Sequence, residues 1–304
     1  MMVIDGHAHV IEELKGYGAR GEFRATGRGR GRWATGEEEQ FFPEQYGDKG
    51  FMGETLVQLM DENGIDKAVL LQGGNYGFHN AYAMEVAKRY PDRFTAVATL
   101  DPYSCLAGEI LDNLIGNLGF RALKFEISQT WGLTGYHPGL RLDERTFASI
   151  FERAERENLT VAIDMGPMGT ASFDIQQIIN VMKRHPRLVM VMTHTLFPCN
   201  DGQNALRLRM LEEMRSENLY FDIANLPPRV HPEPYPYTSQ LDFLREAKKI
   251  IPADRFIWGT DVPSVLNTFT YAQLRDYVME SDVFTPEELA LVMGENALRA
   301  YNMQ

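Results

Sequence analysis

Two histidines near the start of the chain have a spacing that suits a metal ion. His7 and His9 stand two residues apart, directly after a short apolar run. In a β-strand, side chains two residues apart point to the same face, so both imidazoles could bind one ion. Polar residues at an ordinary strand end would give the same pattern. A second feature favours the metal, because residues 255–261 form another short strand that ends at the carboxylate of Asp261.

Between these two ends, short apolar runs alternate with segments of helical periodicity. Eight such runs predict strands, and helix-like sequence follows each one without an intervening linker. Short apolar strands suit burial on both faces of a parallel sheet. The sequence therefore predicts an α/β protein in which residues 1–304 form a single (β/α)8 TIM barrel, with a long loop after strand 1. A doubly wound open sheet is the alternative, but no glycine-rich phosphate loop follows the first strand.

Polar residues recur where the expected strands end, and in a parallel barrel these ends meet at the face that carries active sites. The strand ends give His7 and His9, Gln72, Asp101, Lys124 and Glu126, Asp164, His194, Asp222, and Asp261. Buried ionisable groups are costly unless they are paired or bind a metal. Side-chain alternation turns Asp164 and Asp261 inward. We therefore expect His7, His9, Asp164 and Asp261 to hold one divalent ion, Zn²⁺ or Mn²⁺.

A bound ion of this kind explains why the site would exist. Such an ion lowers the pKa of a water molecule to about 7 and so supplies hydroxide at neutral pH. Asp261 would then accept the remaining proton. His194 would act as an acid or base, or as an electrophile toward a carbonyl oxygen.

The long segment of residues 11–49 is polar and rich in glycine, and it carries five arginines. Long loops in compact domains are often lids or binding loops. Arg28 and Arg30 are therefore candidates to bind a substrate carboxylate, although a solvated, partly mobile loop would have the same composition. Lys124 and Glu126 are further candidates for substrate binding. Lys124 would either orient the substrate or pair with a carboxylate such as Glu126.

Composition excludes several classes of function. The net charge of -12 argues against a general nucleic-acid binder, and no apolar run reaches the length that spans a membrane. The chain shows no signal-peptide core, and Cys105 and Cys199 have the features of free thiols, so a cytoplasmic location is expected. The expected partner is a small carboxylated molecule. A homodimer is compatible with the sequence, but no surface stripe demands one.

At this point the sequence resembles the amidohydrolase superfamily, and within it the branch of aminocarboxymuconate-semialdehyde decarboxylase and its relatives. The matching motifs span almost the whole chain in order: Asp5-Gly6-His7-Ala8-His9, Tyr90-Pro91-Asp92-Arg93-Phe94, Leu100-Asp101-Pro102, His194, Trp258-Gly259-Thr260-Asp261 and Gly294-Glu295-Asn296-Ala297. The resemblance implies a TIM-barrel enzyme with one divalent metal, held by His7, His9, the strand-five residue and Asp261, and with His194 as a catalytic residue. Members hydrolyse amides or lactones, hydrate double bonds, or decarboxylate aromatic and muconate acids.

One residue departs from the family pattern, because Asp164 stands where the family usually has histidine. An aspartate would favour Mn²⁺ or Mg²⁺, or the metal is weakly held or absent. Three functions remain open. The first is a metal-dependent hydrolase of a small carboxylated amide or lactone. The second is a non-oxidative, metal-dependent decarboxylase of an unsaturated or aromatic acid. The third is a metal-independent lactonase or a non-catalytic ligand-binding barrel.

Overall fold

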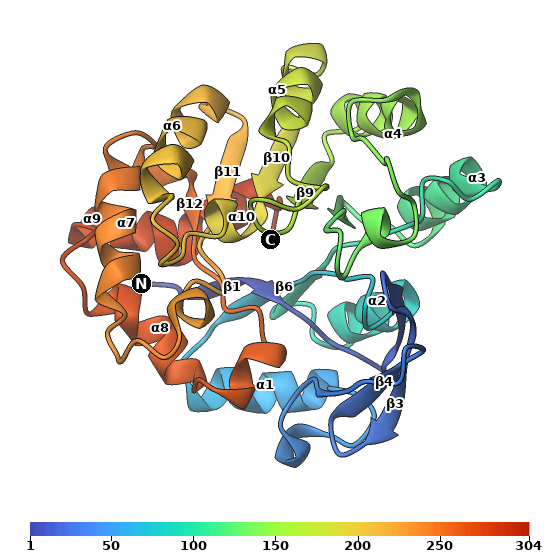
Figure 1. Cartoon of the computed structure of the whole chain (residues 1–304), viewed down its shortest axis with the longest axis horizontal. Helices are drawn as coiled ribbons and strands as arrows, with labels where there is room; N and C mark the ends of the chain where they lie inside the picture. Colours follow the sequence, from blue (N-terminus) through green and yellow to red (C-terminus); the bar gives the residue numbers. More distant parts are fainter. Residues whose placement is uncertain (304) are drawn as a thin grey trace.

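Parallel strands form the centre of the molecule in the computed structural model, which describes residues 1–303 (Figure 1). Eight of the described strands run parallel to a neighbour: β1 (Ile4–Ala8), β6 (Lys67–Leu70), β7 (Phe94–Ala96), β8 (Ala122–Glu126), β9 (Thr160–Asp164), β10 (Val189–Met192), β11 (Leu219–Asp222) and β12 (Phe256–Ile257). They form two sheets with the orders β1-β6-β7 and β12-β11-β10-β9-β8. Parallel bridges between Ala98 and Leu123 and between Ala8 and Val262 join the sheets at both seams. This arrangement confirms the predicted (β/α)8 barrel.

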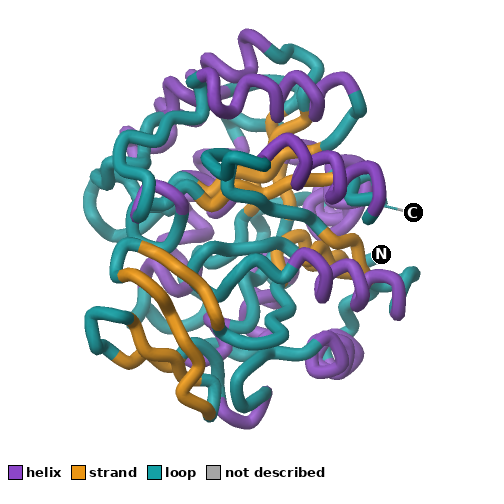
Figure 2. The backbone as a smooth tube through the Cα atoms, turned by 90° about the vertical axis from the view of Figure 1, so that its right-hand side faces the viewer, coloured by secondary structure: helices purple, strands orange, loops and turns teal. Residues whose placement is uncertain are grey.

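Helices surround the strands (Figures 1 and 2). They are α1 (Gly53–Glu62), α2 (Asn80–Arg89), α3 (Ala107–Asp112), α4 (Arg145–Arg156), α5 (Ile175–Arg184), α6 (Asn204–Met214), α7 (Thr238–Lys248), α8 (Tyr271–Met279), α9 (Pro286–Ala290) and α10 (Asn296–Ala300). The α9 helix begins with a capping box, in which Thr285 and Glu288 satisfy each other's backbone N–H groups. Within residues 1–303, every helix is too short or too polar to cross a bilayer.

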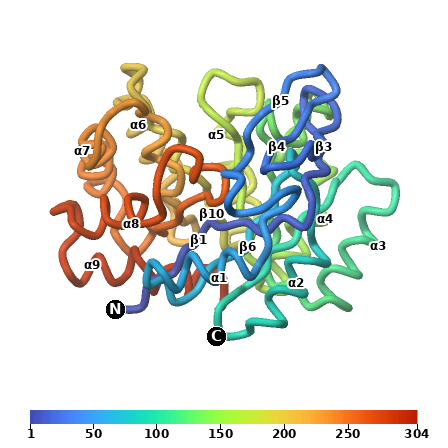
Figure 3. Tube along the Cα trace, turned by 90° about the horizontal axis from the view of Figure 1, so that it is seen from below, coloured from blue at the N-terminus to red at the C-terminus, as the bar shows by residue number. Residues whose placement is uncertain are grey.

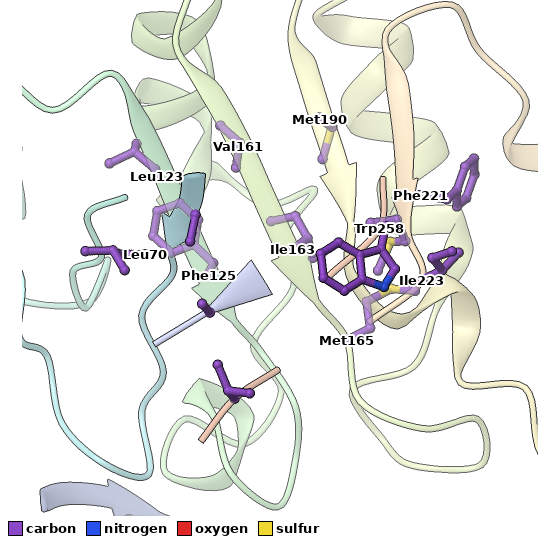
Figure 4. Close-up of a cluster of buried hydrophobic side chains, with 14 of the residues drawn as sticks. Leu70, Leu123, Phe125, Val161, Ile163, Met165, Met190, Phe221, Ile223 and Trp258 are labelled. Carbon is purple, nitrogen blue, oxygen red and sulfur yellow. The ribbon is translucent and has the colours of Figure 1, made fainter. Parts of the chain in front are cut away.

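Side chains alternate along the strands as the sequence predicts. Ala162 and Ile257 belong to a small buried cluster inside the barrel, together with Tyr301 near the end of the chain. Val161 and Ile163 belong instead to the larger cluster between strands and helices, part of which is shown in Figure 4. Since alternate residues share a face, Asp164 and Asp261 follow the inward positions.

The segment of residues 11–49 is not a long loop, so this part of the predicted fold is wrong. It forms an antiparallel sheet of β2 (Lys15–Gly18), β3 (Gly21–Gly27), β4 (Arg30–Trp33) and β5 (Glu38–Gln40). Phe23 and Trp33 pair across β3 and β4, and their ring centroids lie 4.6 Å apart in a buried contact. Gly31 fits beneath this pair because a Cβ atom there would lie 2.2 Å from the Phe23 ring. The glycines and arginines had suggested a loop, but they occupy the tight and the exposed positions of a sheet.

This inserted sheet lies at the end of the molecule opposite the two termini (Figure 3). Backbone hydrogen bonds and side-chain contacts hold it against barrel loops, for example the bond from the N–H of Tyr17 to the carbonyl of Gly74 at 3.0 Å. The Arg20 guanidinium contacts the rings of both Trp33 and Trp131, 4.3 and 5.1 Å from their centroids. The side-chain amide of Asn267 donates a hydrogen bond to the carbonyl of Gln40 at 3.0 Å. The sheet therefore covers the C-terminal ends of the strands, where the site lies.

Candidate active site

His7 and His9 are held so that their Nε2 atoms face Asp261. The Nδ1–H group of His7 donates to Asp222 at 2.8 Å, and that of His9 donates to the carbonyl of Leu71 at 3.0 Å. In a neutral imidazole this leaves a lone pair on Nε2. The Nε2 atoms of His9 and His7 lie 2.9 and 3.4 Å from one oxygen of Asp261. Two lone pairs that face a carboxylate repel it unless a cation lies between them, so the arrangement suits a metal ion.

His194 comes to the same place from the other sheet. Its Nδ1–H group donates to the carbonyl of Ala224 at 3.1 Å, so its Nε2 atom also points inward. One ligand atom from each of His7, His194 and Asp261 lies within 4.8 Å of the others. In a tetrahedral zinc site with bonds of ~2.1 Å, two ligand atoms lie about 3.4 Å apart. These three residues would have to close by up to about 1.4 Å to share an ion, so His194 stands beside the metal position rather than in it.

The structure brings together most of the predicted metal ligands but not Asp164. His7, His9 and Asp261 meet as expected, whereas an oxygen of Asp164 lies 3.3 Å from Nε2 of His194. Asp164 ends β9, next to β10, while Asp261 follows β12 and lies beside β1. Side-chain alternation predicts the correct face for Asp164 but cannot fix its position around the barrel.

Two segments of the site have unusual backbone conformations. Residues 194–197 all have positive φ, with a value of 59° at His194, and Asp261 has a φ of 70°. Such conformations cost free energy in residues with side chains and gather at functional sites. Gly259 allows the close approach of its strand to β1, because a Cβ atom there would lie 2.8 Å from Cβ of His7. The backbone is thus shaped to turn Asp261 and His194 toward His7.

A cavity of about 450 Å³ opens above these residues. All of the predicted site residues except His7, Arg28 and Arg30 line it. Arg28 and Arg30 are exposed on the inserted sheet, and Arg30 lies 3.5 Å from Glu38. Their predicted role in substrate binding is therefore not supported by their position.

Residues 4–303 match the family model described as Amidohydrolase. This chain belongs to the amidohydrolase family. A comparison with curated protein sequences finds no match.

Several solved structures share the fold of this amidohydrolase. An amidohydrolase from Burkholderia multivorans with bound zinc is 16% identical, with a TM-score of 0.72 over 100% of both chains. A probable 2-pyrone-4,6-dicarboxylic acid hydrolase from Acinetobacter baumannii with citric acid bound is also 16% identical, with a TM-score of 0.70 over 99% of this chain and 100% of that one. The 2,6-dihydroxybenzoate decarboxylase from Rhizobium is 17% identical, with a TM-score of 0.59 over 82% of this chain and 88% of that one. At these identities the likeness establishes the fold alone.

Three pKa shifts in this amidohydrolase fit a metal site with an acid–base pair beside it. Burial lowers the pKa of His9 to about 4, so its imidazole is neutral, as a metal ligand must be. Burial opposes the charged forms of Asp164 and His194, but their mutual contact outweighs it. The pKa of Asp164 falls to about 2 and that of His194 rises to about 9. At neutral pH the pair is therefore a carboxylate and an imidazolium, which can donate a proton.

Sequence reasoning missed Arg229, which follows β11 and lines the cavity. Its guanidinium lies 4.5 Å from the centroid of the Phe197 ring, and among the described residues its buried Nε atom finds no hydrogen-bond partner. Burial lowers the pKa of Arg229. A desolvated guanidinium with free donors suits an anionic ligand. Its position in a loop after a predicted strand end was the available signal.

Asn225 and Tyr76 were also missed, and both contact the histidine–aspartate group. The Asn225 amide donates to the second oxygen of Asp261 at 2.5 Å. The hydroxyl of Tyr76 lies 2.5 Å from Nδ1 of His9, close to the carbonyl of Leu71. Both contacts restrict the orientation of the residue that they touch.

Asp222 fixes the orientation of the histidines without lining the cavity. It accepts hydrogen bonds from Nδ1–H of His7 and, at 2.7 Å, from the backbone N–H of His194. For Asp222→Asn we expect a ~10–100-fold loss of zinc affinity, the usual effect of removing such a partner. Competition with a fluorescent chelator measures the affinity, and Asp282→Asn, at an exposed position, is the control. An affinity within twofold of the native value would contradict this role.

Proposed function

We propose that this amidohydrolase is a metal-dependent hydrolase of a small carboxylated amide or lactone. One ion, Zn²⁺ or Mn²⁺, would be held by His7, His9 and Asp261, while His194 beside them stays charged through its contact with Asp164. The observation that carries this proposal is the convergence of two Nε2 lone pairs on one oxygen of Asp261. When bound, the ion supplies a water of pKa about 7 as the nucleophile. The zinc-containing relative and the hydrolase relative support the proposal.

The protein's own residues would divide the remaining work. Asp261 accepts the proton that the attacking water releases and passes it to the leaving group. His194, charged by its contact with Asp164, orients the substrate and donates a proton when needed. Arg229 binds the substrate's acidic group, in place of the exposed Arg28 and Arg30.

Two measurements test the proposed function. Elemental analysis of protein purified without chelator should find one Zn²⁺ or Mn²⁺ per chain. A panel of small carboxylated lactones and amides, followed with a pH indicator, should then show release of acid. If the purified protein holds no metal but turns over the panel, it is a metal-independent lactonase. If it holds no metal and shows no turnover, it is a ligand-binding barrel.

Decarboxylation is the second candidate, and the charged state of His194 favours it. An imidazolium paired with Asp164 can protonate carbon as carbon dioxide leaves. A set of hydroxybenzoates and unsaturated acids, followed by carbon dioxide release, separates this activity from hydrolysis.

For Arg229→Gln we expect KM for the best carboxylated substrate to rise ~10–100-fold, the value of a charged hydrogen bond. The value of kcat should change little, and the neutral methyl ester of the same substrate should show no change in KM. Arg28→Gln is the matched control, because it removes an exposed arginine near the cavity roof. Equal KM values for Arg229→Gln and the native protein would show that another residue binds the substrate's acidic group.

A further inference from the structure

The ammonium group of Lys124 lacks a direct partner inside the protein. Lys124 exposes only 2% of its surface and lines the cavity. Within residues 1–303, neither a hydrogen bond nor an ion pair reaches its Nζ atom. The nearby Glu126 is satisfied differently, since its two oxygens accept hydrogen bonds from Gly74 at 3.1 Å and Ser128 at 3.2 Å. Its side chain lines the cavity, and a charged donor without a protein partner suits an anionic group of a ligand that enters there.

The position of Lys124 shows which part of a ligand it would meet. Lys124 lies opposite Ala162 in the sheet, one inward position deeper in the barrel than Glu126, which lies opposite Asp164. Its charge acts on His9, Asp164 and Glu126, which are groups of the reaction centre. Lys124 therefore lies on the same inward face as Glu126 and lines the same cavity as His9 and Asp261.

We propose that Lys124 is a catalytic residue whose ammonium donates a hydrogen bond to the substrate oxygen that gains negative charge during attack. This inference rests on the proposed hydrolysis. The water oxygen bonds to the carbonyl carbon, and the bond from that carbon to the leaving nitrogen or oxygen breaks. The water proton passes through Asp261 to the leaving atom, while Lys124 keeps all of its protons. A fixed donor in a water-poor cavity stabilises such a charge strongly.

The charge of Lys124 also favours the ionised forms of Glu126 and Asp164. Within residues 1–303 no ion pair joins its Nζ atom to either carboxylate, so its hydrogen-bond donors are not used by them. Lys124 is thus placed to serve a ligand that enters the cavity.

The test compares two anions in metal-loaded protein. Methylphosphonate is tetrahedral, like the attacked carbonyl carbon, whereas acetate is planar. By calorimetry, Lys124→Met should weaken methylphosphonate binding about tenfold or more and acetate binding less than twofold. On the best panel substrate, kcat should fall ~10²–10³-fold with little change in KM. Lys124→Arg, which keeps a charged donor, should recover part of both losses. Lys183→Met, at an exposed position of α5, is the matched control.

Other results would overturn the inference. If Lys124→Met binds methylphosphonate within twofold of the native affinity, Lys124 is not the proposed hydrogen-bond donor. An equal loss for both anions would make Lys124 a general anion anchor. A fall in metal content or in Tm for Lys124→Met would make it a structural or metal-binding residue, since loss of an unpaired buried charge should leave Tm equal or higher. Failure of the proposed function looks different, because the native protein itself would then lack metal or release no acid from the panel of lactones and amides.

Discussion

Replacement of Asp261 by asparagine should abolish most of the activity while the barrel stays folded. Asp261 is the residue on which both Nε2 atoms converge, at 2.9 and 3.4 Å, and it is also the proposed proton carrier. Loss of proton transfer alone should lower kcat ~10²–10⁴-fold. The metal content should fall as well, because the carboxylate is the anionic ligand of the group.

The fold should survive Asp261→Asn for a structural reason. An asparagine amide can donate a hydrogen bond to the free Nε2 lone pair of His9, so the metal-free variant should melt at or above the temperature of the metal-free native protein. Differential scanning calorimetry in the presence of a chelator measures this, and Asp282→Asn is the control for the loss of one carboxylate. Native activity in Asp261→Asn would refute the proposed mechanism outright.

Removal of the metal is the second experiment with a large expected effect. Dialysis against dipicolinate should reduce turnover of the panel substrate to the background rate, and Zn²⁺ or Mn²⁺ should restore it. Metal-loaded protein should also be more stable, by about 2.7 kcal/mol when free metal is 100-fold above its Kd. This corresponds to a rise in Tm of roughly 5 °C for a domain of this size.

The stability measurement needs its own control. Asp222→Asn should bind the metal more weakly, so its Tm should rise less than that of the native protein at the same zinc concentration. Chelated protein that keeps full activity would favour the metal-independent lactonase.

The sequence was sufficient for the barrel because each strand and helix has its own local signal. Apolar runs and helical periodicity predicted the order of elements, and alternation predicted that Asp164 and Asp261 follow inward positions. Both inferences depend on neighbours in the sequence. The strands within residues 11–49 escaped this reasoning because, between residues 20 and 40, Phe23 and Trp33 are the only large apolar residues among glycines, arginines and glutamates.

The site was harder to predict because its contacts depend on how far apart the strands that carry its residues lie around the barrel. Local sequence patterns do not determine these distances. Nothing in the sequence determines that Asp164 contacts His194 and lies outside the group formed by His7 and Asp261. Arg229 lies in a loop whose conformation no periodicity describes, and its importance appears only when its lack of a partner is seen. The run of arginines in residues 11–49 therefore suggested Arg28 and Arg30 as ligand-binding residues. The arginine that lines the cavity is Arg229, which lies outside that run.

The contact of Arg20 with two indole rings gives this protein a built-in optical probe. The chain has three tryptophans, and one of them, Trp258, is fully enclosed in the core. Trp33 and Trp131 lie with their ring centroids 6.0 Å apart, and Trp131 also lines the cavity. Emission from this pair should respond when a molecule enters beneath the inserted sheet, so binding could be followed by native fluorescence without a label and before any substrate is known.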